Sequence, residues 1–307
     1  MVSISRTDTQ ALIPEEVSDA MMVGIANESA ALTMFKQVPI STNQQRMPVL
    51  AALPVAYFVT GDTGQKQTSK ASWENKYFNV EELAVIIPVP ENVIDDTGFD
   101  MWGSIQPLLE NAIARALDAA VFFGANKPTS WPVDIVTGAL GVGNVVEQGT
   151  ASSAAGGIAQ DISALMALLE VQGMDITGAV ASTFMRGQVR GLRDTTGQPI
   201  TSVSINDWWG IPVTYPMRGI WPTGEDTAQA VIGDYSQSLL GVRKDFTFKL
   251  LDQAVIQDGN GDIIFNLAQQ DMVAMRVVAR YAWVVANPIN YEQPDEALRY
   301  PFGVLRK

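Results

Sequence analysis

The sequence predicts an α+β protein in which a long β-hairpin runs directly into one long helix. Residues 47–60 (MPVLAALPVAYFVT) and 73–90 (WENKYFNVEELAVIIPVP) are apolar and rich in β-branched and aromatic side chains, as strands are. Residues 61–70 (GDTGQKQTSK) contain no large apolar side chain and predict the hairpin tip. Elsewhere, helical and strand-like segments are intermixed without βαβ regularity, which favours the α+β class.

The hairpin is expected to need support from another surface. Each arm is about twice the usual strand length, and at roughly 3.3 Å per residue the first arm reaches on the order of 45 Å. A two-stranded ribbon has no core of its own and is marginally stable in water. The simplest source of such a surface is a second copy of the same chain. The hairpin therefore indicates a protein that assembles with copies of itself.

The segments before the hairpin predict an arm, a short helix and a strand. Residues 1–13 are polar and non-periodic, as in an extended arm. Pro14 with Glu15 beside it suits the first turn of a helix, which we expect to run to about Asn27. Residues 33–40 are strand-like.

A long helix is expected over residues 100–124, where apolar side chains recur at helical spacing. Its predicted packing face is Ile105, Leu109, Ala112, Ala116 and Ala120. Residues 95–98 offer capping side chains, and Pro107 either kinks the helix or marks a start near Ser104. Gly124 suits the C-terminal cap. We expect this helix to pack against the final long strand.

The remaining elements follow from shorter signals. Residues 125–156 predict a loop with short strands. Helices are expected at 158–171, with Ile162, Leu165, Met166 and Leu169 on one face, and at 184–192. Strands are expected at 179–182, 211–215, 230–232, 246–251 and 272–286. Residues 258–261 (DGNG) predict a hairpin turn.

Length and composition indicate a large, well-buried protein. The chain has 307 residues, which predicts two lobes or one lobe with extensions. Apolar residues make up 47% and charged residues only 17%, a balance found in subunits whose surface becomes interface, and also in many enzymes.

Composition also excludes several kinds of chemistry. The chain contains neither cysteine nor histidine, which rules out disulfides, thiolate metal sites and Ser-His-Asp triads. Its net charge of −13 lacks the basic surface that sequence-independent DNA binding needs. We predict no catalytic residue, no cofactor and no metal site.

The distribution of apolar residues along the chain does not suggest a membrane protein. The N-terminal residues lack the apolar region of a signal peptide, and no apolar stretch reaches the ~18 residues of a spanning helix. We expect a soluble protein made in the cytosol.

Asp-Thr-Gly occurs twice, at residues 62–64 and 96–98. Two such motifs form the carboxylate pair of aspartic proteases, in which one proton is shared. The first lies in the polar hairpin tip, where such a pair would not be buried. We therefore interpret the first motif as a turn and the second as a helix cap.

Two other motifs match binding patterns only in part. Residues 258–262 (DGNGD) begin like a calcium loop, but Ile263 and Gln269 replace the glycine and the glutamate that such a loop requires. The glycines of residues 138–143 lack the full nucleotide-binding fingerprints. Both segments are interpreted as turns.

The predicted intersubunit contacts at the hairpin tip are Asp62, Gln65, Lys66, Lys70 and Trp73. Lys66 and Lys70 gather positive charge on the hairpin, and a catalytic lysine would need burial to lower its pKa. We expect both to be solvated or to meet acidic groups of a neighbouring copy.

Aromatic and basic residues elsewhere have ordinary interpretations. Residues 208–209 (WW) and Trp221 suit packing better than a ligand platform. Arg299, Arg306 and Lys307 make the C-terminus mildly basic and are expected to lie in a solvated tail.

Taken in order, the segments resemble the major capsid proteins of tailed bacteriophages, the family with the Hong Kong 97-type fold. Residues 11–21, the hairpin and the helix DMWGSIQPLLENAIARALDAAVFFG resemble the segment after the family's arm, its extended loop and its spine helix. Four later segments are similar to the axial-domain strand and helix, the "G-x-P-V" strand, the "G-D-[FY]-S" segment and the closing strand: residues 179–200, 209–216, 231–246 and 275–291.

The resemblance implies a division of the chain into four parts. These are an N-terminal arm and short helix (1–45), the extended hairpin (46–90), a peripheral domain (91–127 with 272–307) and an axial domain (128–271). Many members carry an N-terminal scaffolding domain that maturation removes. If Met1 is the encoded start, scaffolding is separate or absent here.

The resemblance further implies a homo-oligomer of hexamers and pentamers on an icosahedral lattice around double-stranded DNA. Separate scaffolding, portal and decoration proteins are possible partners. An encapsulin-type compartment shares the fold but encloses protein, and nucleic acid in native shells would separate the two. A hydrolase using Asp62 and Asp96 is the enzyme alternative, which a proteolytically active monomer would favour.

Overall fold

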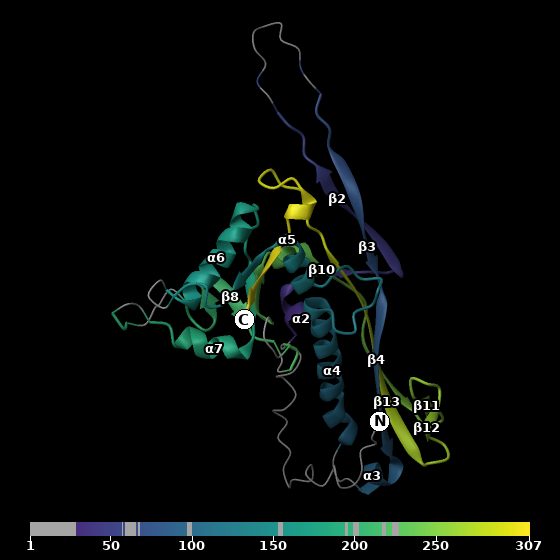
Figure 1. The fold of residues 1–307 in the computed structure, drawn as a ribbon. Helices are drawn as coiled ribbons and strands as arrows, with labels where there is room; N and C mark the ends of the chain where they lie inside the picture. Colours follow the sequence, from purple (N-terminus) through teal and green to yellow (C-terminus); the bar gives the residue numbers. More distant parts are fainter. Residues whose placement is uncertain are drawn as a thin grey trace.

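Two larger sheets, several helices and a projecting hairpin make up the protein (Figure 1). The computed structural model describes residues 29–56, 58, 66, 68–96, 100–152, 156–193, 196–198, 203–216, 219–222 and 227–307, without the side chains of 244–246. The helices are α2 (Ala30–Met34), α3 (Glu91–Asp96), α4 (Met101–Phe123), α5 (Ile135–Val142), α6 (Ile158–Val171), α7 (Thr183–Arg190) and the 3₁₀ turns η4 (Tyr235–Gln237) and η5 (Glu296–Leu298).

The strands form two sheets and two separate hairpins. The four-stranded sheet has the order β1-β10-β13-β4, with β1 Lys36–Pro39, β10 Ser238–Leu251, β13 Met272–Val285 and β4 Glu81–Pro90. The six-stranded sheet has the order β5-β14-β9-β6-β8-β7, with β5 Val145–Glu147, β14 Phe302–Arg306, β9 Ala228–Gly233, β6 Gly178–Ala181, β8 Ile211–Thr214 and β7 Asp207–Trp208. The hairpins are β2 (Gln44–Ala52) with β3 (Ser72–Asn79), and β11 (Val255–Gln257) with β12 (Ile263–Asn266).

Helix α4 is closed at both ends by groups that its sequence supplies. The Asp100 side chain accepts a hydrogen bond from the Gly103 N–H at 3.0 Å, which satisfies a free donor of the first turn. Gly124 has a φ of 69°, the left-handed conformation that favours glycine. Pro107 therefore lies inside the helix, and Asp95–Asp96 of the expected cap belong to α3 instead.

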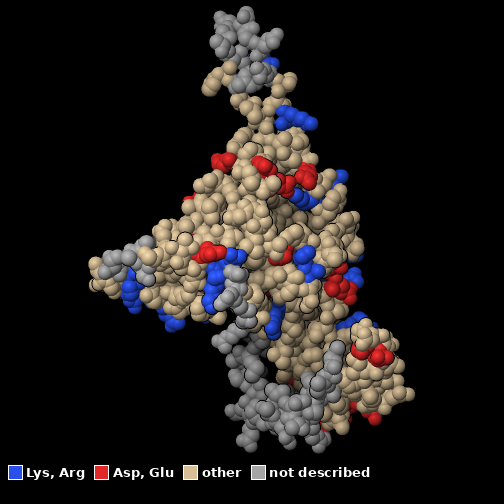
Figure 2. Space-filling model, in the orientation of Figure 1, with Lys and Arg blue, Asp and Glu red and all other residues tan. Residues whose placement is uncertain are grey.

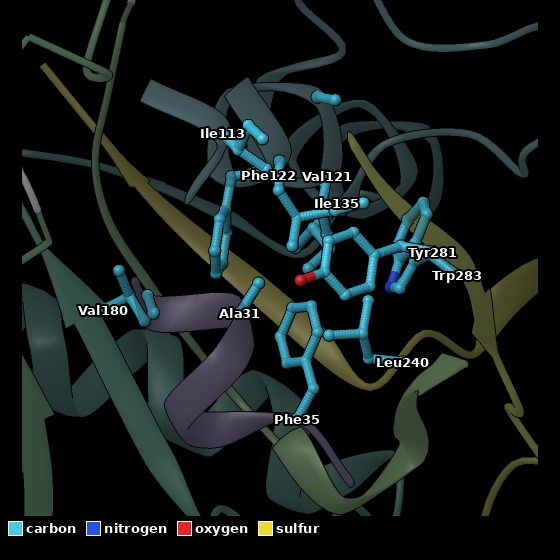
Figure 3. Packing of buried hydrophobic residues seen from close by; sticks show 14 of the residues in the cluster. Ala31, Phe35, Ile113, Val121, Phe122, Ile135, Val180, Leu240, Tyr281 and Trp283 are labelled. Atoms are coloured by element: carbon cyan, nitrogen blue, oxygen red, sulfur yellow. The ribbon is translucent and has the colours of Figure 1, made fainter. Parts of the chain in front are cut away.

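The expected packing of the long helix against the final strand is confirmed. Buried side chains of α4 and β13 belong to one hydrophobic cluster, together with α2 and Phe35. The rings of Phe35 and Phe122 lie 5.7 Å apart, and Figure 3 shows both converging with Tyr281 and Trp283 on one interior. This cluster is the core between α4 and the four-stranded sheet.

Part of the predicted packing face of α4 is wrong. Ile105, Leu109 and Ala120 are buried, but Ala112 and Ala116 are exposed. Two rows of buried residues run along the helix, each with a spacing of four residues, and the second row contacts α2. The first row is Ile105, Leu109, Ile113, Leu117 and Val121, and the second is Ala114, Asp118 and Phe122. Ala116 lines an open hollow of about 180 Å³ between α4 and β4.

The second lobe is the six-stranded sheet with α6 and α7 (Figure 1). Helix α6 coincides with the predicted helix, and all four of its predicted apolar residues are buried. Helices α3 and α5 were missed because each is short. The turn before β12 is confirmed, since Gly261 has a φ of 91°.

The hairpin is shorter than the sequence indicates. Its second arm is divided at Val80: β3 pairs with β2, whereas β4 pairs with β13 in the four-stranded sheet. Residues 33–40 are likewise divided into α2 and β1. Residues 73–90, which the sequence predicts as one long strand, therefore form two strands that pair with different neighbours.

Two segments pair across the expected domain division. The C-terminal β14 was assigned with the peripheral part but lies between β5 and β9 in the six-stranded sheet. The expected axial segment contains β10, which pairs with β13. The expected solvated C-terminal tail is wrong as well, because β14 is largely buried and only Lys307, which follows it, is exposed. Among the described residues, no helix is long and apolar enough to cross a membrane.

Candidate assembly surface

The β2–β3 hairpin has one buried face and one exposed face. In an antiparallel pair, residues directly opposite each other point to the same side. Three such pairs form what we call the outer hairpin face: Arg46 with Tyr77, Pro48 with Asn75, and Leu50 with Trp73. Trp73 is 66% exposed and Tyr77 48%, which is unusual for large aromatic side chains.

The opposite face holds the root of the hairpin to its own chain. Val49 and Phe78 are 8% and 1% exposed. Phe78 packs in a small cluster with Ile40 of the β1 end, Leu239 of β10 and Val284 of β13. The expectation that the hairpin lacks support within the subunit therefore holds only for its outer part.

The segment between β13 and β14 also contacts the hairpin. The Ile289 N–H donates to the Leu50 carbonyl at 3.1 Å, and the Tyr291 hydroxyl donates to the Pro54 carbonyl at 2.8 Å. Further along, the Lys76 ammonium lies 2.8 Å from a Glu296 carboxylate oxygen. We call residues 287–299 the bracket, because they connect the hairpin to the body.

Beyond the paired strands, the hairpin carries exposed apolar and basic side chains. Val55 is 66% exposed and Phe58 is fully exposed at 103%. Lys66 and Lys70 are exposed, as a solvated or intersubunit role requires. The predicted contacts Asp62 and Gln65 lie outside the described residues, as does the first Asp-Thr-Gly motif.

Among the described residues, the motifs with possible catalytic or metal chemistry do not form a site. Asp258 accepts hydrogen bonds from the N–H groups of Asn260 (2.8 Å) and Asp262 (2.9 Å), so this segment is a turn, and these bonds hold the pKa of Asp258 below its usual value. Of the second Asp-Thr-Gly, Asp96 ends α3 rather than capping α4. Across the part of the chain that the structure describes, no group of three potential metal ligands occurs.

The glycines of residues 138–143 and the tryptophans considered above as a ligand platform contribute to local structure and packing. Gly138 lies within α5, where a Cβ would meet the Tyr300 ring, and Gly143 caps that helix with a φ of 84°. Trp208 is buried, and Trp221 packs edge-on against Phe123 at 5.1 Å. Trp209 is 42% exposed.

One buried acid stabilises the junction between α2 and α4. Asp118 of α4 accepts hydrogen bonds from the Ser29 hydroxyl (2.8 Å) and from the N–H groups of Ala30 and Ala31 (both 3.0 Å). Its burial raises the pKa to about 6, and these hydrogen bonds lower it in part. Asp118 therefore caps α2 from outside and fixes it to the long helix.

Sequence reasoning found Trp73 but missed its neighbours on the outer hairpin face. The available signal was the alternation of Trp73, Asn75 and Tyr77 along β3, which places all three on one side. Nothing local identified the bracket as the support of the hairpin, because its partners are more than two hundred residues away: 237 residues separate Tyr291 from Pro54.

The composition of the outer hairpin face is typical of a structural subunit that contacts other proteins. Aromatic and arginine side chains lie on a projecting two-stranded element, and charged side chains are sparse on the face shown in Figure 2. Such a composition is typical of protein–protein contacts.

Comparison with known proteins agrees with this class. The phage capsid family matches residues 9–290. The chain is 38% identical to a solved structure of Microbacterium phage Oxtober96, with a TM-score of 0.80 and coverage of 99% of each chain. It is 24% identical to the major capsid protein of Staphylococcus phage 80alpha, over 89% of this chain and 81% of that protein. The capsid of a native GTA particle shares the fold, with a TM-score of 0.63, 16% identity and coverage of 96% and 95% of the two chains.

The chain belongs to the phage capsid family. Its function is that of a major capsid protein, and it is a component of the phage particle. The mixed helix and sheet architecture agrees with the Hong Kong 97-type fold that the sequence resemblance implies.

Proposed function

We propose that the subunit assembles through the outer hairpin face into hexamers and pentamers of an icosahedral shell. The shell would be built in the host cytoplasm and would enclose double-stranded DNA. The observation that carries the proposal is the exposure of Trp73 and Tyr77 on one side of a projecting hairpin. A neighbouring copy supplies the surface that these side chains lack.

Residue chemistry supports this contact. Tryptophan, tyrosine and arginine are enriched among the residues that dominate binding energy, and Trp73, Tyr77 and Arg46 lie on the same face of the hairpin here. Covering them removes apolar surface from water in every subunit of the shell. A modest contribution from each contact is multiplied by the number of copies.

The tip lysines add an electrostatic contribution in the same proposal. Lys66 and Lys70 are exposed, and the chain as a whole carries 33 acidic residues against 20 basic ones. A neighbouring copy therefore offers many carboxylates within reach of the tip. Each exposed pair contributes only about 0–1 kcal/mol, but it recurs throughout the shell.

The DNA is proposed to be held by confinement, because the subunit carries a net charge of −13. An acidic wall repels a polyanion and leaves the genome free to exit. Three arginines, Arg186, Arg190 and Arg193, lie exposed on or beside α7 and form a local basic group in this acidic chain. A gel shift with short duplex DNA at low salt tests the point: no shift is expected, and tight binding would contradict confinement.

No catalytic role is proposed. Membership in a structural family supports this view. An encapsulin-type compartment is the second possibility on the same fold, and the similarity to phage capsid proteins favours the viral shell.

Expression of the full chain, followed by electron microscopy and nuclease treatment of the particles, tests the proposal. Closed shells are expected, and shells from infected cells should hold nuclease-protected DNA. The double variant Trp73→Ser, Tyr77→Ser should stay a folded free subunit, whereas exposed Trp209→Ser in the other lobe is the matched control. Normal shells from the double variant would refute the outer hairpin face as the contact.

A further inference from the structure

We propose that Arg299 is the residue that fixes the angle of the hairpin, by holding the bracket in one shape. This inference rests on the proposed function only where it concerns shells. The bracket lies between β13 and β14, at the point where the two larger sheets and the hairpin meet (Figure 1). Its conformation therefore determines where the hairpin projects.

Arg299 closes the bracket into a loop. Its side chain is only 3% exposed. The Arg299 guanidinium donates to the Asn287 side-chain oxygen (Nε, 3.2 Å), to the Asn287 carbonyl (Nη2, 3.2 Å) and to the Gln293 carbonyl (Nη1, 2.6 Å). The Asn287 amide returns a hydrogen bond to the Arg299 carbonyl at 3.0 Å. Both ends of the bracket are thus tied together by one planar group.

The backbone conformation at the first residue agrees with this role. Asn287 has a φ of 41°, a left-handed conformation that asparagine tolerates better than most residues. Asn287 lies two residues after the end of β13. The guanidinium bonds to both the side chain and the carbonyl of Asn287 hold that conformation in place.

The bracket contacts the second lobe on one side. The Asn290 amide donates to the Gln172 carbonyl at 2.7 Å, at the end of α6. Gly173 follows with a φ of 72°, and a Cβ there would approach a Glu292 carboxylate oxygen to 2.9 Å. This close approach fixes the bracket against the lobe.

On the other side the bracket contacts the hairpin at three places. Ile289 and Tyr291 donate to the carbonyls of Leu50 and Pro54, and Glu296 pairs with Lys76. The hairpin is thereby connected to the lobe through a segment that Arg299 shapes. The side-chain hydrogen bonds of Arg299 all go to Asn287 and Gln293 of the bracket, so we infer that it is a positioning residue for assembly rather than a contact.

The substitution Arg299→Lys tests this role in the full chain. Lysine keeps the charge and the aliphatic stem but cannot direct three N–H groups in one plane. We expect hydrogen exchange at the Ile289 amide and at the paired amides of β2 and β3 to become about tenfold faster in the free subunit. Exchange in α4 and the six-stranded sheet should not change. Complete shells should give way to irregular particles.

Four further variants make the result specific. Arg190→Lys is the matched control, because it makes the same chemical change at an exposed position. Lys76→Glu should loosen the hairpin as Arg299→Lys does, and the exchanged pair Lys76→Glu with Glu296→Lys should restore it. Trp73→Ser with Tyr77→Ser should block shells without changing exchange in the hairpin.

Two outcomes would overturn the inference. One is unchanged exchange of the hairpin amides in Arg299→Lys. The other is faster exchange throughout α4 and both sheets, which would show that Arg299 only stabilises the fold. Because exchange is measured on the free subunit, either outcome can be recognised even if the parent chain forms no shells.

Discussion

The core beneath α4 and the outer hairpin face use the same kinds of side chain in opposite ways. Phe122 and Trp283 are 1% and 0% exposed, whereas Trp73 and Tyr77 are 66% and 48% exposed. Fully burying a large apolar side chain contributes about 1.5–3 kcal/mol. The core gains this contribution when the subunit folds, and the hairpin gains it only when another surface covers it.

Under the proposed mode of assembly, folding and assembly depend on separate residues. Changes in the core should alter the free energy of unfolding of the single subunit. Changes on the outer hairpin face should leave that free energy alone and alter assembly. The four predictions below are ordered by their expected effect on the free energy of unfolding.

The sharpest test compares two neighbouring residues of α4. Leu117 is fully buried and Ala116 is exposed. Leu117→Arg should lower the free energy of unfolding by about 3–5 kcal/mol, because it buries an unpaired charge and removes core packing. Ala116→Arg should change it by less than about 0.5 kcal/mol. Urea denaturation of both variants is the measurement, and equal losses would contradict the assignment of the two faces.

The next effect is a pH dependence at the buried carboxylate. The pKa of Asp118 is raised from 3.8 to about 6, so between these values the folded chain holds a proton that the unfolded chain has lost. Its contribution to stability therefore falls as pH rises through this window, by about 3 kcal/mol in total.

The variant Asp118→Asn isolates that contribution, since an amide does not titrate. Urea denaturation between about pH 4 and pH 7 should show a flatter profile in the variant than in the parent chain. Other acidic groups titrate in both proteins and cancel in the difference. Parallel profiles would show that Asp118 has an ordinary pKa.

A smaller effect on the free energy of unfolding is expected from Trp73→Ser with Tyr77→Ser. Both side chains are largely exposed, so the free subunit should lose less than about 1 kcal/mol. Thermal unfolding of the unassembled chain measures this, with light scattering to follow assembly. A large loss would mean that the hairpin aromatics belong to the folded core.

The smallest effect is expected at the hairpin tip. Changing Lys66 and Lys70 to glutamate should leave the free energy of unfolding within about 0.5 kcal/mol of the parent value, because both are exposed. Assembly should nevertheless slow, most at low salt, where exposed charges are least screened. Light scattering across a salt series decides, and rates equal to the parent's at every salt concentration would remove the lysines from the interface.

The sequence predicted best those elements that can be recognised from their own residues, without knowing what they pack against. Helices α4 and α6 have apolar spacing and end signals that are read locally, and both were placed within a residue or two. The division at Val80 was not predictable, because Asn79-Val80-Glu81 carries no turn signal. Only the pairing of β4 with β13 shows where one strand stops and the next begins.

The projecting hairpin was predicted in outline and not in detail. The long polar-tipped hairpin identified the region, and Trp73 proved to be exposed on it. Ala112 and Ala116 were misplaced because a small residue fits either side of a helix, so its identity says little about burial. Arg299 looked like part of a basic tail, since its partners Asn287 and Gln293 are polar residues without a pattern.

The long paired strands β10 and β13 make the subunit stiffest along one direction, the direction of the strands. Each strand spans 14 residues, and at about 3.3 Å per residue the antiparallel pair forms a beam of about 45 Å. The hydrogen bonds between the strands run across the beam, so opposite forces on the two strands shear all of them at once, and the load is shared. The register shifts between Val242 and Thr247 interrupt the ladder, and there the beam bends most easily. A particle under internal pressure would therefore yield by flexing at these shifts before its strands part.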